Sequence, residues 1–212
     1  MLIILALAGQ IISSCGNKGK GDTEIQNEGE SIPAQGSAED QAQPPVPAAA
    51  NEIPEQELFM EACLNGIIKD IEKYVNQGIE VSAADEDGRT GLMLAAFNGH
   101  TDIVRMLLDS GAGINLADSV GRTALLYAAS GPFPKTVELL LQREADPNTV
   151  DNLEHFSALM HAAAEGHMDV VKVLLEHGAD PSLTDIDGDN AESFARQGNH
   201  IDVAEYLKSS AQ

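Results

Sequence analysis

The sequence has no tryptophan, and only five phenylalanines and three tyrosines are spread over its 212 residues. It also has only two cysteines, Cys15 and Cys63, which excludes a framework of several disulfides. Alanine, leucine and glycine are plentiful instead. This composition favours closely packed helices that are separated by frequent turns.

Basic residues are also scarce. Twelve Lys and Arg stand against 34 Asp and Glu, so the formal net charge is −22 at pH 7. A surface of that sign repels phosphate backbones, and we therefore expect no nucleic-acid partner. The same charge favours solubility, and it attracts a basic protein or a cationic peptide.

Motifs of catalysis and of nucleotide binding are missing as well. The sequence contains no GxSxG, no HExxH and no paired cysteines. The stretch GNKGKGD, residues 16–22, has glycines five residues apart, but Asp22 stands where a phosphate-binding loop needs lysine. We therefore expect no enzyme activity, no cofactor and no metal site.

The chain starts with a short apolar run, MLIILALAGQIISS over residues 1–14, which is too short to span a bilayer and is typical of a signal peptide. The stretch ISSC, Ile12–Cys15, resembles the lipobox of bacterial lipoproteins, in which a cysteine follows one aliphatic and two small residues. That resemblance implies a lipid on Cys15, and acyl chains hold a protein firmly in a bilayer. In such lipoproteins an aspartate after the cysteine often marks retention in the inner membrane. Gly16 stands at that position here, which favours the outer membrane, facing the periplasm. No Lys or Arg precedes the run, and a secreted protein with a free cysteine is the alternative.

The next segment, residues 15–54, has almost no large apolar side chains after Cys15. It consists mainly of Gly, Ser, Gln, Glu, Pro and Ala, and it cannot bury enough apolar area to offset the entropy of ordering. We therefore expect a lipidated, disordered tether between a membrane and a folded domain.

The remaining chain repeats itself with a period of about 33 residues. Identical residues recur at that spacing, among them Gly88 and Gly121, Thr90 and Thr123, Leu92 and Leu125, and Leu108 and Leu141. A first, degenerate copy aligns through Ala62, Gly66 and Gly78, and the third full copy has one extra residue in its turn. The domain 55–212 thus divides into about five repeats: 55–84, 85–117, 118–150, 151–184 and 185–212.

These copies resemble the ankyrin repeat, with its DxxGxT turn, its paired alanines, its GH junction and its LLLxxGA end. The resemblance implies an all-α repeat solenoid of stacked helix-turn-helix repeats with β-hairpin-like finger turns. One repeat cannot bury its own apolar face, so neighbours share a core and the end repeats carry polar outer faces. Glu192 and Arg196 replace core residues of the consensus and suit such a cap.

Local signals predict where the helices begin and end. Hydroxyls of Thr90, Thr123 and Ser157 are expected to cap the first helix of three repeats. The stretch SGPFPKTV departs from the pattern, because Pro132, Phe133 and Pro134 replace the residues found at 99–101. We expect Gly131 to end one helix in the left-handed conformation, Pro134 to start the next, and Phe133 to pack on an adjacent loop. A partner contact by this 131–134 loop is the alternative.

The histidines and one acidic loop are expected to be structural. His100, His167 and His200 fall at the GH junctions, where the resemblance implies local hydrogen bonds, and His161 falls at a core position. The stretch DIDGD, 185–189, has its glycine at the fourth position, whereas a helix–loop–helix calcium site needs it at the sixth.

The family resemblance implies that a partner binds to the finger turns and to the exposed side of each first helix. Apolar side chains at Phe97, Val120, Leu153 and Ile186 are expected to form an exposed stripe there. Carried onto this sequence, the binding positions are Glu86, Asp87, Arg89, Phe97, Asn98, Ser119, Val120, Arg122, Ser130, Asn152, Leu153, His155, Ala164, Glu165, Ile186, Asp187 and Asp189.

Together these patterns predict a non-catalytic, monomeric scaffold in the bacterial envelope that binds another protein, one with a basic patch. A periplasmic inhibitor or immunity protein against a toxic enzyme is the first alternative. An accessory of an oxidative-stress enzyme is the second, weaker one.

Overall fold

A computed structural model describes residues 54–210, which form ten helices. The expected signal peptide, the lipidation site at Cys15 and most of the expected tether lie outside the described residues. The helices are α2 Glu55–Asn65, α3 Ile68–Asn76, α4 Gly91–Phe97, α5 Thr101–Asp109, α6 Ala124–Ala129, α7 Pro134–Gln142, α8 Ala158–Ala164, α9 Met168–Glu176, α10 Ala191–Gln197 and α11 Ile201–Ser210.

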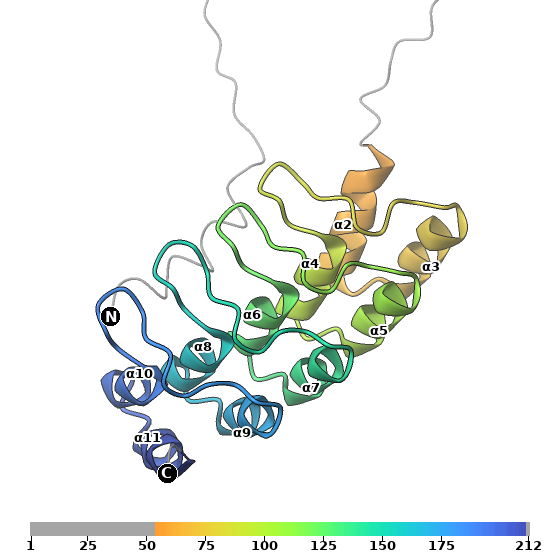
Figure 1. Ribbon diagram of the computed structural model, residues 1–212. Helices are drawn as coiled ribbons and strands as arrows, with labels where there is room; N and C mark the ends of the chain where they lie inside the picture. The colour runs from red at the N-terminus through yellow and green to blue at the C-terminus, as the bar shows by residue number, and fades with distance from the viewer. Residues whose placement is uncertain (1–53, 211–212) are drawn as a thin grey trace, which may run out of the picture. The chain divides into compact units, whose positions relative to one another are not determined.

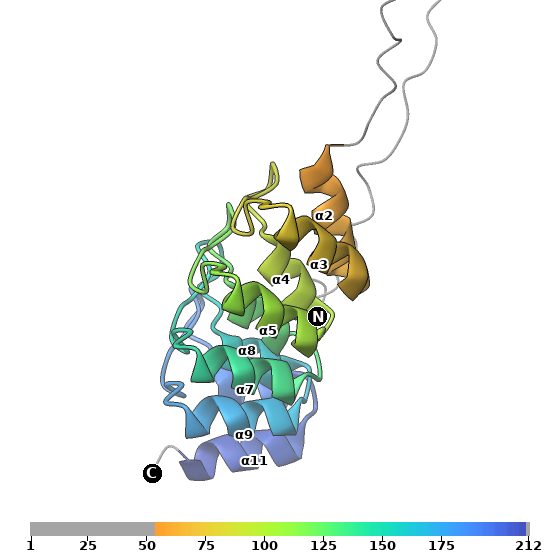
Figure 2. The ribbon, with the colours of Figure 1, turned by 90° about the vertical axis from the view of Figure 1, so that its right-hand side faces the viewer.

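The helices form five pairs that stack in two layers (Figure 1). Helices α2, α4, α6, α8 and α10 make the inner layer, and α3, α5, α7, α9 and α11 make the outer layer, which Figure 2 shows as a ladder. Each inner helix packs on its own outer helix and on the inner helix of the next repeat. The predicted all-α repeat solenoid is confirmed.

The inner layer is held together by small and apolar side chains. Helices α4, α6 and α8 contain no Asp, Glu, Lys or Arg, and their paired alanines, such as Ala95 and Ala96, are fully buried. Small side chains let neighbouring backbones approach closely, and leucines such as Leu125 and Leu159 fill the space between them. Burying one leucine contributes about 1.5 to 3 kcal/mol, so the stack is stabilised repeat by repeat.

The outer helices are amphipathic. In α5 the side chains of Ile103, Val104 and Leu107 are buried, while Leu108 is only half-buried at the edge of the stripe. The C-terminal end is closed by polar groups, because Arg196 forms ion pairs with Glu192 and Glu205. These ion pairs give the last helix pair the polar outer face expected of an end repeat.

Turns between repeats carry one short β-bridge each, as in a hairpin. The bridges join Ala84 to Thr90, Ala117 to Thr123, Val150 to Ser157, and Thr184 to Asn190. Gly88, Gly121 and Gly188 have φ between 81° and 88°, a conformation that side chains disfavour. The predicted hairpin-like finger turns are therefore present in this structure.

Helix caps agree with the predictions at two of three positions. The Thr90 hydroxyl accepts a hydrogen bond from the Met93 N–H at 3.4 Å, and Ser157 does the same from Met160 at 3.3 Å. The prediction for Thr123 is wrong, because its buried Oγ1 has no hydrogen-bond partner. In the other two repeats a methionine sulfur lies 3.4 Å from the capping residue's own N–H, whereas Leu126 offers no such acceptor.

The SGPFPKTV junction matches two expectations and contradicts a third. Helix α7 begins at Pro134, and the ring of Phe133 lies over Gly99 of the preceding repeat, where an added methyl group would overlap it. The prediction for Gly131 is wrong, since it is not among the residues with positive φ. Other repeats place the left-handed residue one position later, as at Gly99, and that position is Pro132, whose ring fixes φ at a negative value.

Candidate protein-binding surface

Four finger turns lie side by side along one edge of the stack (Figure 1). We name them finger 1 (85–89), finger 2 (118–122), finger 3 (151–156) and finger 4 (185–189). Backbone hydrogen bonds join each finger to the next: Ser119 N–H donates to Asp87 O at 2.9 Å, Asn152 N–H to Val120 O at 2.8 Å, and Ile186 N–H to Glu154 O at 3.1 Å. The row is therefore a preformed surface and not a set of independent loops.

An aspartate opens each finger and fixes its conformation. Asp151 Oδ1 accepts hydrogen bonds from three backbone N–H groups, those of Leu153, Glu154 and His155, at 2.9 to 3.1 Å. Asp85, Asp118 and Asp185 each accept two such bonds in their own fingers. Asparagine and aspartate favour turns for this reason, because the side chain replaces a missing backbone acceptor.

Fingers 1 and 2 are closed by an arginine that pairs with the opening aspartate. Arg89 Nε lies 2.8 Å from Asp85 Oδ2, and its Nη2 lies 3.1 Å from Asp87. Arg122 contacts Asp118 Oδ2 in the same way, through Nε and Nη2 at 2.8 Å each. The positive charges of these two fingers are thus already paired within the chain.

The Asp118 carboxylate is buried and has one further donor. The Tyr127 hydroxyl, from α6, donates to Asp118 Oδ2 at 2.8 Å, and the Arg122 guanidinium lies 4.9 Å from the centre of the Tyr127 ring. Burial and this hydrogen bond raise the pKa of Tyr127 well above its usual range. A buried carboxylate is tolerated only when its oxygens are satisfied, and here four donors do so.

Finger 3 is built differently. Its one extra residue puts Phe156 at the closing position, where its carbonyl accepts the Asp151 N–H, and puts His155 in the left-handed conformation at φ 61°. The Phe156 ring meets His161 and Phe194 edge-to-face, with ring centres 5.6 and 5.0 Å apart. A salt bridge in the first two fingers is replaced by an aromatic cluster in the third.

His161 lies in the core, as its repeat position predicts. It is 8% exposed, at the place that Tyr127 occupies in the preceding repeat. Burial lowers its pKa to about 4, although the Asp151 charge opposes the shift. The imidazole is therefore neutral at pH 7. His100 makes the expected junction bond, with Nε2 3.1 Å from Leu64 O.

The predicted binding residues fall into two groups. Those that are exposed are Glu86, Asp87, Asn98, Ser119, Asn152, Leu153, His155, Glu165, Ile186 and Asp187. Those that are half-buried are Arg89, Phe97, Val120, Arg122, Ser130, Ala164 and Asp189. Asn98 and Ser130 are also engaged internally, because they donate to the carbonyls of Leu64 and Tyr127 at 2.7 and 2.8 Å.

The expected apolar stripe is reduced to half of its members. Phe97 packs edge-to-face on Tyr127 at 6.1 Å, and Val120 is half-buried. Leu153 and Ile186 are 64% and 56% exposed. Sequence reasoning missed the roles of Tyr127 and Phe156. Tyr127 stands where the preceding repeat has Leu94. Phe156 stands where fingers 1 and 2 have their closing arginine, once the extra residue of the third repeat is aligned.

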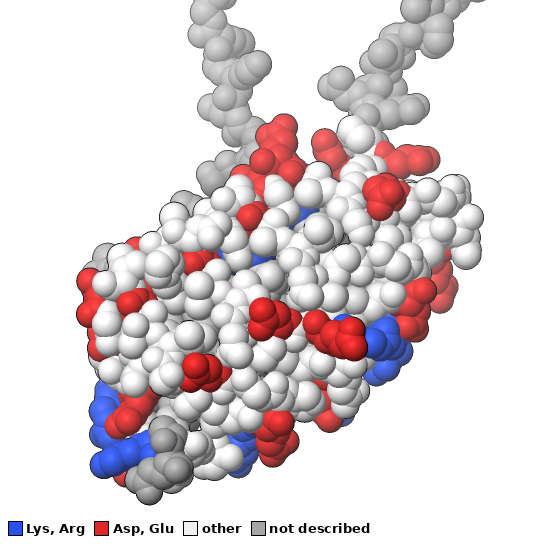
Figure 3. Space-filling view, in the orientation of Figure 1, with Lys and Arg blue, Asp and Glu red and all other residues white. Residues whose placement is uncertain are grey.

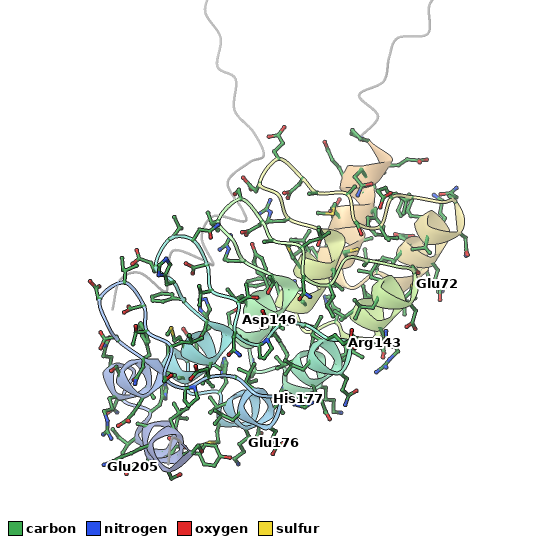
Figure 4. All side chains as sticks on the ribbon, in the orientation of Figure 1. Glu72, Arg143, Asp146, Glu176, His177 and Glu205 are labelled. Carbon is green, nitrogen blue, oxygen red and sulfur yellow. The ribbon has the colours of Figure 1, made fainter. Side chains whose placement is uncertain are left out.

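Acidic side chains outnumber basic ones over the surface in Figure 3. Seven of the ten Lys and Arg in the described range lie on or directly after outer helices, and these are Lys69, Lys73, Arg105, Lys135, Arg143, Lys172 and Lys208. Figure 4 labels Arg143 in this layer, where it pairs with Asp109 at 2.8 Å. The finger row therefore keeps unpaired carboxylates that a basic partner complements.

The side chains of residues 54–210 form no cluster of three or more His, Cys, Asp or Glu that could hold a metal ion. In DIDGD, Asp185 Oδ1 is occupied by backbone N–H groups of the same finger. Cys63 is buried, and burial raises the pKa of its thiol to about 12, so it stays protonated. None of the described helices has the length and apolar character needed to cross a membrane.

Comparison with known families agrees with this architecture. A family model described as ankyrin repeats, in three copies, matches residues 59–151 and 133–212. No curated protein matches the chain. The two matched ranges together cover residues 59–212, well over half of the sequence, and the repeats they describe are protein-binding scaffolds. The chain belongs to the ankyrin-repeat family.

Proposed function

We propose that this protein is a non-catalytic scaffold that binds another protein through its finger row and the adjoining ends of its first helices. The observation that carries the proposal is the row of four fingers, joined by backbone hydrogen bonds and fixed by their opening aspartates. A preformed surface loses little entropy on binding, which favours specific recognition. The unpaired carboxylates of the row favour a partner with a basic patch.

We further propose that a lipid on Cys15 holds this scaffold in the bacterial cell envelope, at the outer membrane and facing the periplasm. The support is the ISSC stretch after a short apolar run, together with the composition of residues 15–54, which suits a spacer. A spacer leaves the finger row accessible to a partner in the same compartment.

Site-specific photo-crosslinking in the host cell tests the binding surface. A photoreactive amino acid is placed singly at Glu86, Ser119, Asn152 and Asp187, with Glu72 and Glu176 of the outer layer as matched controls (Figure 4). We expect a protein adduct from at least one finger position and none from the two controls. Adducts from the controls alone, or from no position, contradict the proposed surface.

Fractionation and metabolic labelling test the anchor. We expect the wild-type chain to incorporate an alkyne-labelled fatty acid and to sediment with membranes, and Cys15→Ser to lose both properties. If Cys15→Ser stays with the membranes, the anchor is not this cysteine.

The net charge of −22 also favours a second function, inhibition of a basic toxic enzyme in the periplasm. Such an inhibitor would use the same finger row. A deletion strain is then expected to become sensitive to the toxin, and re-expression of the protein to restore resistance. Unchanged sensitivity argues against this role and leaves the scaffold proposal standing.

A further inference from the structure

Two neighbouring fingertips expose large apolar side chains. Leu153 of finger 3 and Ile186 of finger 4 are 64% and 56% exposed, the highest values among the large apolar side chains of residues 54–210. The equivalent tip positions are Glu86 and Asp87 in finger 1 and Ser119 and Val120 in finger 2, and the one apolar residue among them, Val120, is half-buried. Polar residues are the default in exposed turns, so an apolar side chain at both adjacent tips is an unusual feature of this half of the row.

Hydrogen bonds fix the backbone of these two tips. The backbone N–H of Leu153 donates to Asp151 Oδ1 at 3.0 Å, and the N–H of Ile186 donates to Glu154 O at 3.1 Å, which joins the two fingers. Finger 4 is closed by Asp185 N–H, which donates to Asp189 O at 2.9 Å. The backbone that carries both side chains is therefore ordered before any partner arrives, and little loop ordering opposes binding.

The charge around the pair differs from that of fingers 1 and 2. There, Arg89 and Arg122 close the fingers and pair with carboxylates. At the same position fingers 3 and 4 have Phe156 and Asp189, and they contain no Lys or Arg. Fingers 3 and 4 thus contain carboxylates but no cation. Asp187 is exposed, Glu154, Asp185 and Asp189 are half-buried, and Asp151 is buried.

The nearest basic residue along the chain does not compensate for these charges. Arg196 of α10 already pairs with Glu192 and Glu205 at 2.8 and 3.2 Å. Asp189 receives only a neutral donor, Gln197 Nε2, at 3.0 Å. Cations of a partner would therefore find carboxylates here that no Lys or Arg of fingers 3 and 4 pairs with, and they would be most effective beside an apolar side chain that excludes water.

We propose that the partner docks on fingers 3 and 4, and that its contacting segment carries an apolar side chain between lysines or arginines. This inference rests on the proposed scaffold function and narrows it to one half of the finger row. The apolar side chain covers Leu153 and Ile186, and the flanking cations contact Asp187 and its neighbours. Fingers 1 and 2, whose arginines are already paired, serve as the rigid support.

Methyl NMR of the full chain in detergent tests the proposal with three synthetic peptides. They are GSKLKLKSG, the same peptide with serine for leucine, and the same peptide with glutamate for lysine. We expect only GSKLKLKSG to shift the methyl signals of Leu153 and Ile186 at millimolar concentration or below. Equal shifts with the serine peptide, or equal shifts at Val120, overturn the proposal, because they indicate unspecific attraction by charge.

Matched double variants separate the two halves of the row. Leu153→Ser with Ile186→Ser is expected to weaken GSKLKLKSG binding at least tenfold, since about one order of magnitude accompanies loss of a covered apolar side chain. Glu86→Ser with Val120→Ser changes the equivalent tips of fingers 1 and 2 and is expected to change binding less than about twofold. Similar losses in both variants overturn the proposal, and thermal unfolding confirms that each variant is folded.

Two outcomes distinguish this inference from the proposed function. If the cellular partner is crosslinked but is lost with the variant of fingers 1 and 2 instead, the scaffold function stands and the docking site is wrong. If the Leu153 and Ile186 signals shift with protein concentration in the absence of peptide, the occupant is a second copy of this chain. That result also overturns the proposed partner segment.

Discussion

Fingers 2 and 3 occupy equivalent places in successive repeats and are held by different chemistry. In finger 2 a buried aspartate, Asp118, receives Arg122 and Tyr127, whereas in finger 3 the aromatic rings of Phe156 and His161 take these two places. The backbone closes in the same way in both, since each opening aspartate accepts backbone N–H groups. The repeat thus constrains the turn and the buried volume, but it leaves the polarity beneath the turn open.

The largest effect should come from removing the buried carboxylate of finger 2. Asp118→Ala leaves Arg122, the Tyr127 hydroxyl and two backbone N–H groups without their acceptor, and we expect it to lower the free energy of unfolding by about 3 kcal/mol. Asp151, which is equally buried, accepts only backbone N–H groups, so Asp151→Ala should cost less, about 1.5 kcal/mol. Urea denaturation measures both, and equal losses would remove the contrast between the fingers.

An intermediate effect should appear with pH beneath finger 3. The pKa of His161 is about 4 in the folded protein and about 6.5 when unfolded, so the unfolded chain binds the extra proton first. Stability from this group is complete above pH 6.5 and declines as pH falls toward 4. Between pH 7.5 and 5.0, above the pI of about 4.3, the expected loss is about 2 kcal/mol.

His161→Leu provides the control, because Leu94 occupies the equivalent position in an earlier repeat. The unfolding free energy of wild type minus that of this variant should fall by about 2 kcal/mol as pH drops from 7.5 to 5.0, and it should be constant above pH 7. A pH-independent difference would show that His161 is not kept neutral by burial.

The smallest expected effect is the contribution of the Tyr127 hydroxyl to the hydrogen bonds around Asp118. Tyr127→Phe removes one hydroxyl donor to Asp118 and leaves the ring against Phe97, so we expect a loss of about 1 kcal/mol. Tyr206→Phe is the matched control, and its half-buried ring should tolerate the change within about 0.5 kcal/mol. Equal values for the two variants would mean that the Tyr127 hydroxyl bond to Asp118 adds nothing to stability.

Much of the fold could be predicted from local patterns. The 33-residue period, the turn glycines and the proline at the start of α7 each act within a few residues, so their consequences follow from backbone geometry. The role of a single side chain depends instead on which neighbours compete for it. Thr123 and Gly131 have the residue types that cap or end helices, yet neighbouring residues prevented both roles.

In the candidate surface too, the repeat predicted backbone positions but not side-chain exposure. The positions of the fingers followed from the repeat. The exposure of Phe97, Val120, Leu153 and Ile186 did not, because the Phe97 ring packs on Tyr127 of the next repeat. Leu153 and Ile186 lack such a neighbour and stay exposed. The partner-binding role of these positions and the lipid on Cys15 are still predictions.

By itself the sequence determined the solenoid, its helix pairs and the strongly acidic charge, since periodicity and composition act without knowledge of distant contacts. Only the tertiary structure decided which carboxylates are paired and which are free, because Arg122, Tyr127 and Asp118 meet only after a turn and a helix have packed together. The same packing decided that finger 3 rests on aromatic rings. Side-chain partners depend on three-dimensional neighbours, and a repeat pattern specifies backbone positions more tightly than it specifies the groups that meet there.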